Sequence, residues 1–270
     1  MNNIKEPPPT EKLLEKEGRD IRRMFASIAP TYDLLNRLLS LGFDQKWRER
    51  AVELSKLPEA GQPSAFGGVT PTKGIKVLDI CTGTADLAIA YSQKIGQGGL
   101  VVGSDFCWEM LARAPQKRKT LKNGCPITLV QADALHLPFA DNSFDVVSVA
   151  FGIRNVSDLK EGLKEMARVV SPGGRVVILE FGLPESRVFK GLYNFYFNQV
   201  LPKVGNLIAA IGSSERTRAY TYLSASVGKF PDARGLRELM ESLGLTQVKS
   251  HPLSLGIANV HVGKKPLREA

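Results

Sequence analysis

Three aspartates stand where short apolar runs of the sequence end. Asp79 closes "VLD", Asp105 closes "VVGSD", and Asp133 closes "LVQAD", with Ala134 next. A carboxylate can accept two hydrogen bonds from a ribose diol or one from the exocyclic amine of an adenine, beside a backbone N–H such as that of Ala134. Parallel strands bring their carboxyl ends to one edge of a sheet, where such folds bind ligands. The three positions together favour a site for an adenosine-containing ligand.

The segment that follows the first run, "DICTGTAD" (79–86), has the composition of a tight turn into a helix. Small residues let the backbone approach a ligand closely, and the first turn of a helix offers unpaired N–H groups. Gly83 and Thr84 are therefore candidate ligand-binding residues. A dinucleotide site would prefer G-x-G-x-x-G, which this segment lacks. A structural turn here, and an N-cap role for Asp105 before Trp108, remain the alternative interpretations.

Short apolar runs alternate with amphipathic segments from residue 75 onward. This order predicts an α/β fold, a doubly wound and mostly parallel sheet covered by helices on both faces. The last two runs have a short connection, which predicts an antiparallel pair at one end of the sheet. The predicted strands number seven, over 75–80, 99–106, 127–133, 143–151, 175–181, 245–253 and 255–263.

The remaining segments divide the chain around this core. Residues 21–55 carry apolar residues at helical spacing, with breaks near Pro30 and Gly42. We expect a flexible N-terminal tail over 1–23, followed by a single domain over 24–270. Within this domain, the Pro- and Gly-rich stretch 57–74 is predicted to be a flexible loop, and 183–230 an insertion on the substrate side.

Charge and composition limit the kinds of partner. The chain has a formal net charge of +9, and residues 186–270 hold 12 Lys and Arg against 5 Asp and Glu. Without a run of five or six basic residues or a known nucleic-acid signature, a nucleic-acid groove is disfavoured. A solvated basic face or attraction to an anionic membrane surface remains. Three scattered cysteines and no secretory segment favour a cytoplasmic protein.

Longer stretches of the sequence resemble the UbiE/MenG family of class I S-adenosylmethionine-dependent methyltransferases, which methylate quinol rings at carbon. The resemblance runs from about Met24 to Pro266. It is carried by "MFASIAPTYDLLNRLLSLGFDQKWR", "VLDICTGTADLA", "AFGIRNVSD", "LEFGLP", "LYNFYF", "YTYLSASVGKFP" and "GIANVHVGKKP".

The resemblance implies S-adenosyl-L-methionine as methyl donor, no metal, and a set of cofactor residues. Carried over position by position, these are Thr84, Asp105, Asp133 and Ala134, to which the turn adds Asp79 and Gly83. The chain departs from the family where some members have a serine, since it has Ala150 there. It also has Cys81 and Thr82 where methyltransferases commonly have glycine.

Methyl transfer to a ring carbon requires orientation of the acceptor and a group that takes up a proton. Arg154 and Asn155 of "GIRN" are expected to contact the oxygens of the quinol, with pairing of Arg154 to a carboxylate as the alternative. Tyr32 and Asp33, in an N-terminal helix that can fold over the cofactor, are further catalytic candidates, with packing or capping as the alternative.

The insertion supports a lipid acceptor. Residues 189–197, "FKGLYNFYF", hold five of the chain's 20 aromatic residues. Such a segment suits a lid over an apolar tunnel or a patch at the headgroup level of a bilayer, while a buried core helix is the alternative. A polyprenylated naphthoquinol or benzoquinol substrate, peripheral membrane contact and a possible homo-oligomer are the expected partners.

The sequence is consistent with four functions to different degrees. Demethylmenaquinol methylation, the last step of menaquinone biosynthesis, is preferred because "CTGTAD" resembles that branch of the family. The alternative within the family is methylation of 2-methoxy-6-polyprenyl-1,4-benzoquinol for ubiquinone, or both reactions. A nucleic-acid methyltransferase directed at amino groups would carry N/D-P-P-Y/F where this chain has "AFGIRN". A non-catalytic cofactor-binding subunit is the most distant alternative.

Overall fold

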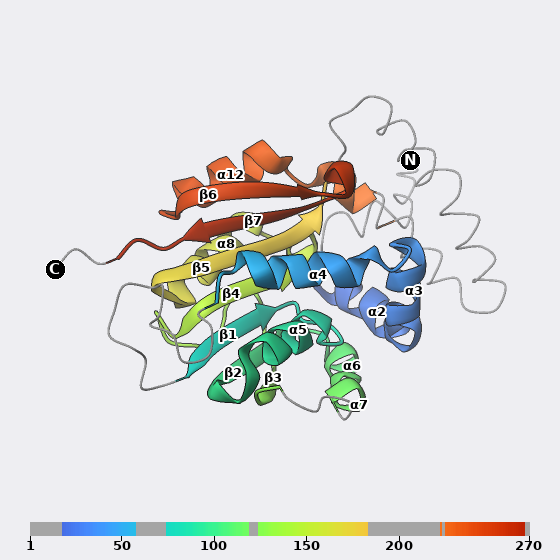
Figure 1. Cartoon of the computed structure of the whole chain (residues 1–270). Coiled ribbons are helices and arrows are strands. Elements are labelled where there is room, and N and C mark those ends of the chain that lie inside the picture. Colours follow the sequence, from blue (N-terminus) through green and yellow to red (C-terminus); the bar gives the residue numbers. More distant parts are fainter. Residues whose placement is uncertain (1–17, 58–73, 119–123, 183–221, 223–224, 268–270) are drawn as a thin grey trace, which may run out of the picture.

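Seven strands form one sheet in the order β3-β2-β1-β4-β5-β7-β6 (Figure 1). The computed structural model describes residues 18–57, 74–118, 124–182, 222 and 225–267. The first five strands are parallel, whereas β7 is antiparallel to both β5 and β6. The predicted seven-stranded, mostly parallel sheet is confirmed, as is the terminal antiparallel pair. The strands are β1 (Ile75–Ile80), β2 (Gly99–Asp105), β3 (Ile127–Gln131), β4 (Phe144–Ala150), β5 (Val170–Phe181), β6 (Thr246–Leu253) and β7 (Ala258–Lys264).

Helices cover both faces of the sheet. One face packs against α4 and α5, and the other packs against α8 and α12 (Figure 1). The described α-helices are α2 (Gly18–Ile28), α3 (Tyr32–Leu39), α4 (Phe43–Leu54), α5 (Asp86–Ile95), α6 (Trp108–Leu111), α7 (Ala114–Arg118), α8 (Leu159–Val169) and α12 (Ala233–Ser242).

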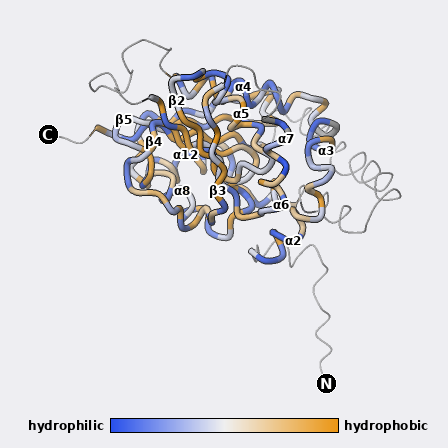
Figure 2. The backbone as a smooth tube through the Cα atoms, turned by 90° about the horizontal axis from the view of Figure 1, so that it is seen from below, coloured by the Kyte–Doolittle hydropathy of each residue, from blue (hydrophilic) through white to orange (hydrophobic). Residues whose placement is uncertain are grey.

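Successive apolar residues of the central strands point to opposite faces of the sheet, which explains why both faces are buried. In β1, Val77 joins the hydrophobic cluster under α4 and α5, while Leu78 joins the cluster under α8 and α12. Val146 and Val147 of β4 divide in the same way. A strand with apolar residues at successive positions must be covered on both sides. Figure 2 shows the hydrophobic strands in the interior of the described chain.

Helices α2 and α3 lie beside the carboxyl ends of the parallel strands (Figure 1). The predicted breaks are confirmed, because a short 3-10 turn (Ala29–Thr31) contains Pro30 and Gly42 has a left-handed φ of 78°. The tail predicted over 1–23 is too long, because helix α2 begins at Gly18. Ile21 of this helix is 1% exposed in an apolar cluster, and its burial orders residues 18–23.

The described part of the chain between β2 and β3 forms two short helices, α6 and α7, and Pro115 falls in the first turn of the second, where its missing N–H is tolerated. The predicted loop 57–74 and insertion 183–230 lie mostly outside the described residues. Among the helices that the structure describes, none has the length and apolar character required to span a membrane.

Candidate active site

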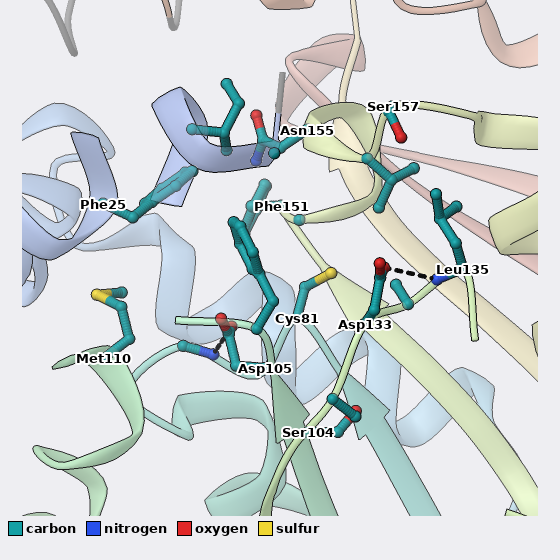
Figure 3. A pocket seen from close by; sticks show the side chains of 18 of the residues that line it. Phe25, Cys81, Ser104, Asp105, Met110, Asp133, Leu135, Phe151, Asn155 and Ser157 are labelled. Carbon is teal, nitrogen blue, oxygen red and sulfur yellow. Dashed lines mark hydrogen bonds between the residues drawn. The ribbon is translucent and has the colours of Figure 1, made fainter. Parts of the chain in front are cut away.

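A cavity opens at the carboxyl ends of the strands, where the strand order reverses between β1 and β4. It encloses about 820 Å³ when counted out to its open mouth, with open solvent included. Asp105 and Asp133 face this space from the strand ends, while Phe25 and Asn155 lie on the opposite side (Figure 3). Of the residues predicted from sequence, those that line it are Tyr32, Gly83, Asp105, Asp133, Ala134 and Asn155.

Asp105 is fixed by the backbone on both sides. Its Oδ2 accepts the N–H of Gly83 at 2.8 Å, and its Oδ1 accepts the N–H of Cys107 at 2.9 Å. Burial raises the pKa of Asp105 to about 6, and the backbone N–H groups oppose this rise. Each carboxylate oxygen keeps a second lone pair for a ligand hydroxyl. Asp105 is not the N-cap of α6, because Cys107 holds that position; the two backbone contacts instead hold the carboxylate at the cavity.

Asp133 and Ala134 form a second polar edge, directly after β3. Asp133 Oδ1 accepts the N–H of Leu135 at 2.9 Å, a local turn that sets the carboxylate toward the cavity (Figure 3). Apolar side chains of Met110 and Leu135 line the same space. The Asp133 carboxylate thus borders a space that also has apolar lining residues.

The first turn owes its shape to alternating left-handed residues. Cys81, Gly83 and Ala85 have φ values of 50°, 57° and 69°. A left-handed conformation costs non-glycine residues about 1 kcal/mol or more each and clusters at functional sites. The turn after β4 packs closely against it, since a Cβ on Gly152 would lie 2.3 Å from Cys81 Cβ. Cys81 therefore lines the cavity, and burial raises its thiol pKa, so the thiol stays protonated.

Asp79 and Thr84 lie beside a smaller adjoining cavity instead of the main one. Asp79 is 1% exposed and accepts the hydroxyl of Thr82 at 2.6 Å. Burial raises the pKa of Asp79 to about 7, against the hydrogen bonds from Thr82 and Ser148. These hydrogen bonds stabilise the turn between β1 and α5. The structure thus places Asp79 and Thr84 behind the turn that Gly83 presents to the main cavity.

Asp33, Thr84, Asp86 and Lys117 form one polar cluster, which we call the clamp. Lys117 Nζ lies 2.6 Å from Asp33 Oδ2, 2.5 Å from Asp86 Oδ1 and 2.7 Å from Thr84 Oγ1. Thr84 Oγ1 in turn donates to Asp33 Oδ1 at 2.6 Å. The clamp ties α3 to the first turn and to α7. The Asp33 carboxylate is therefore already paired with Lys117 and Thr84.

Tyr32 and Asn155 face the cavity from its outer side. Burial raises the pKa of Tyr32, so its hydroxyl is a hydrogen-bond donor at neutral pH. The hydroxyl of Tyr222 donates to Asn155 Oδ1 at 3.1 Å. This contact sets the direction of the Asn155 amide, because its oxygen is already engaged.

Arg154 pairs with a buried carboxylate. Its Nη1 lies 2.6 Å from Glu180 Oε1 and 2.6 Å from the carbonyl oxygen of Phe151, and its guanidinium stacks over the Phe181 ring. The side chains of Arg154 and Glu180 are 7% and 1% exposed. Arg154 does not line the main cavity. The structure thus has the pairing that the sequence left as an alternative, with the partner on β5.

Several residues of the site were not predicted from the sequence. Phe25 and Phe151 give the cavity aromatic walls. Lys117 pairs with Asp33, and Glu180 pairs with Arg154. Phe25 and Phe151 lie within the quoted family stretches, which was the available signal. No local sequence pattern identifies Lys117, because its partners within the clamp lie 31 or more positions away. Among the described residues, no group of three or more His, Cys, Asp or Glu could hold a metal ion.

Solved structures share the fold. A methyltransferase of Thermotoga maritima, described as a possible histamine N-methyltransferase, is 19% identical and covers 91% of this chain and 99% of its own, with a TM-score of 0.58. The phosphoethanolamine N-methyltransferase 2 of Haemonchus contortus, solved with S-adenosylhomocysteine, is 18% identical, with coverages of 74% and 50% and a TM-score of 0.50. These likenesses establish the class of fold.

Relatives found by sequence share more identical residues with this chain than these solved structures do. The ubiquinone/menaquinone biosynthesis C-methyltransferase UbiE of Geobacter sulfurreducens is 41% identical over 94% of this chain and 92% of its own. The demethylmenaquinone methyltransferase of Thermus thermophilus is 43% identical over 90% of this chain and its own full length. The family model of the ubiE/COQ5 methyltransferases matches residues 12–265. The resemblance noted in the sequence is confirmed, and the chain belongs to the ubiE/COQ5 methyltransferase family.

Proposed function

We propose that this methyltransferase moves a methyl group from S-adenosyl-L-methionine to a ring carbon of a polyprenylated quinol, with demethylmenaquinol as the preferred acceptor. The single observation that carries the proposal is the pair of carboxylates, Asp105 and Asp133, facing one cavity in a chain of this family. The name of the Thermus relative favours the menaquinone branch. Methylation of a methoxy-polyprenyl-benzoquinol is the second candidate, favoured by relatives named for both quinones.

The residues of the cavity fit the donor. Both oxygens of Asp105 are held in place, so the carboxylate can accept the two ribose hydroxyls without reorganising. Asp133 and the N–H of Ala134 are proposed to bind the adenine edge between the apolar side chains of Met110 and Leu135. Gly83 brings its backbone against the ligand, and Thr84 and Asp79 support that turn from behind. When bound, the donor supplies an electrophilic methyl group.

The acceptor is proposed to lie against Asn155 and Tyr32. Their side chains can donate hydrogen bonds to the ring oxygens and so orient the reacting carbon toward the methyl group. Phe25 and Phe151 exclude water from the apolar ring. In this proposal Arg154 and Asp33 are positioning residues: Arg154 fixes the carbonyl of Phe151 through its pair with Glu180, and Asp33 fixes α3.

A polyprenyl tail resides in a bilayer, so we also propose peripheral contact with an anionic membrane surface. The formal charge of +9 supports this. The aromatic segment 189–197, which the sequence suggested as a lid or headgroup contact, lies outside the described residues.

Quinone profiling by mass spectrometry in a strain that lacks this protein tests the proposal. We expect a demethylated naphthoquinone to accumulate and to disappear when the chain is restored. Accumulation of a benzoquinone precursor would select the second candidate. An unchanged quinone pool in a strain that makes quinones would refute both.

Donor affinity should depend on pH through Asp105. The carboxylate must be ionised to accept the ribose hydroxyls, and burial places its pKa at about 6. Affinity should therefore be constant at high pH and fall as pH drops below 6, to about one tenth at pH 5. Isothermal titration with S-adenosylhomocysteine between pH 5 and 8 measures this. Asp79→Asn is the control that should keep the slope between pH 5 and 6, and a flat profile would contradict the assignment.

Substitution Lys117→Met should loosen the clamp. The carboxylates of Asp33 and Asp86 would then repel each other near Thr84, and α3 would lose its link to the first turn. We expect donor affinity about tenfold weaker, as for a partly buried charged network worth ~1–2 kcal/mol. Lys94→Met, at an exposed position of α5, should change it less than twofold. Adding Asp33→Asn to Lys117→Met should restore part of the loss, and additive losses would argue against the clamp.

A further inference from the structure

Large apolar side chains are exposed over one short stretch of the N-terminal helices. Among the described residues, six such side chains are exposed, and three of them fall within residues 34–43. Leu34 is 67% exposed, Leu41 76% and Phe43 45%. Single exposed apolar residues are ordinary, whereas a group rimmed by polar residues marks an interaction surface. We call Leu34, Arg37, Leu41, Phe43 and Lys46 the tip.

The backbone at the tip holds these side chains outward. Leu34 lies in the first half of α3, and Leu41 lies in the turn that follows the end of this helix at Leu39. Leu41 and Gly42 have left-handed φ values of 52° and 78°. The turn is closed by hydrogen bonds from Gly42 N to the Arg37 oxygen at 2.8 Å and from Ser40 Oγ to Asp44 Oδ1 at 2.8 Å.

The exposed charges within the tip are cationic. Arg37 and Lys46 are exposed, and Lys46 Nζ lies 5.7 Å from the centroid of the Phe43 ring. Asp44, between them, is 3% exposed and pairs with Arg48 at 2.6 Å, so its charge is directed inward and neutralised. Glu49, one turn further along α4, is the nearest exposed acid in the sequence. Apolar side chains with cations beside them match the boundary between acyl chains and anionic headgroups.

The tip is continuous with the cavity. Helix α3 begins at Tyr32, which lines the cavity, and the next residue, Asp33, belongs to the clamp. Leu34 follows directly on the outer side. A molecule whose tail lies in a bilayer in contact with the tip would therefore have its head beside the cavity mouth.

We propose that the tip is the surface by which this enzyme docks on an anionic lipid bilayer. The assignment rests on the proposed lipid acceptor and adds the surface that meets the membrane. Each of the three apolar side chains and two cations contributes only a small part of the binding free energy that a stable anchor needs. Binding is therefore reversible. The tip acts as a peripheral contact that brings the active site to its lipid substrate.

Sedimentation with vesicles of phosphatidylcholine and phosphatidylglycerol tests the proposal. The variant with Leu34→Ser, Leu41→Ser and Phe43→Ser should bind these vesicles at least tenfold more weakly than the unaltered chain. Leu255→Ser, at a position 64% exposed outside the tip, should bind within twofold of it. Arg37→Glu with Lys46→Glu should weaken binding to anionic vesicles and leave binding to neutral ones unchanged.

Turnover separates this proposal from the proposed function. The triple serine variant should methylate a short-tailed, water-soluble quinol at the normal rate and a vesicle-embedded quinol at least tenfold more slowly. Failure of the unaltered chain on both quinols would refute the function while the vesicle experiment still decides the tip. Equal vesicle binding by the variant and the unaltered chain overturns the docking surface. So does a changed oligomeric state or a lower Tm without loss of vesicle binding, which would show that the tip packs against a second copy or within the chain.

Discussion

Asp105→Asn is expected to weaken donor binding by about 100-fold or more. The amide keeps the shape of the carboxylate but removes its charge, and its NH₂ group would oppose one of the two backbone N–H donors, Gly83 or Cys107. Losing charge-assisted hydrogen bonds of ~1.5–3 kcal/mol each to a ligand diol accounts for this magnitude. Isothermal titration with S-adenosylhomocysteine at pH 8 measures it, where the unaltered carboxylate is ionised.

The matched control is Asp232→Asn. Asp232 also accepts a backbone N–H, that of Gly235 at 2.7 Å, as the N-cap of α12. Asparagine caps helices as well as aspartate does, so donor affinity and stability should both stay near their original values. Retention of full donor affinity by Asp105→Asn, with unchanged circular dichroism, would remove Asp105 from the donor site.

Arg154→Met is expected to lower the free energy of unfolding by ~3–5 kcal/mol, the usual cost of leaving a buried charge without its partner. Glu180 would remain almost fully buried, and the carbonyl of Phe151 would lose its donor. Burial already raises the pKa of Glu180, with Arg154 opposing that rise, so loss of Arg154 should raise this pKa further. Urea denaturation followed by circular dichroism gives the measurement.

Two further variants distinguish a positioning role from a catalytic one. Adding Glu180→Leu to Arg154→Met should recover most of the lost stability, because replacing both members of a buried pair by apolar residues is often neutral. Arg234→Met, which breaks an exposed pair with Glu238, should leave the free energy of unfolding nearly unchanged. If Arg154→Met kept its stability and lost only turnover, Arg154 would act directly on the substrate instead.

The strands could be predicted because their signal is local. Runs such as "IKVLDI" and "RVVILEF" are short, mostly apolar and rich in β-branched residues, which favours strands covered on both faces. The cavity edge followed from the same signal, since parallel strands place Asp105 and Asp133 on one side by construction. Helix ends were less accurate: α2 begins before the predicted boundary because Ile21 packs against distant residues.

Residue patterns along the chain were enough to predict the sheet, its covering helices and the acidic edge. The order of the strands and the contacts between charged groups required the folded structure: Asp33 with Lys117, Arg154 with Glu180, and Asp79 behind the turn. Periodicity records the burial of each element separately. Ion pairs between segments depend on how helices pack across the sheet and on how much water that packing removes, and neither is written in the spacing of residues.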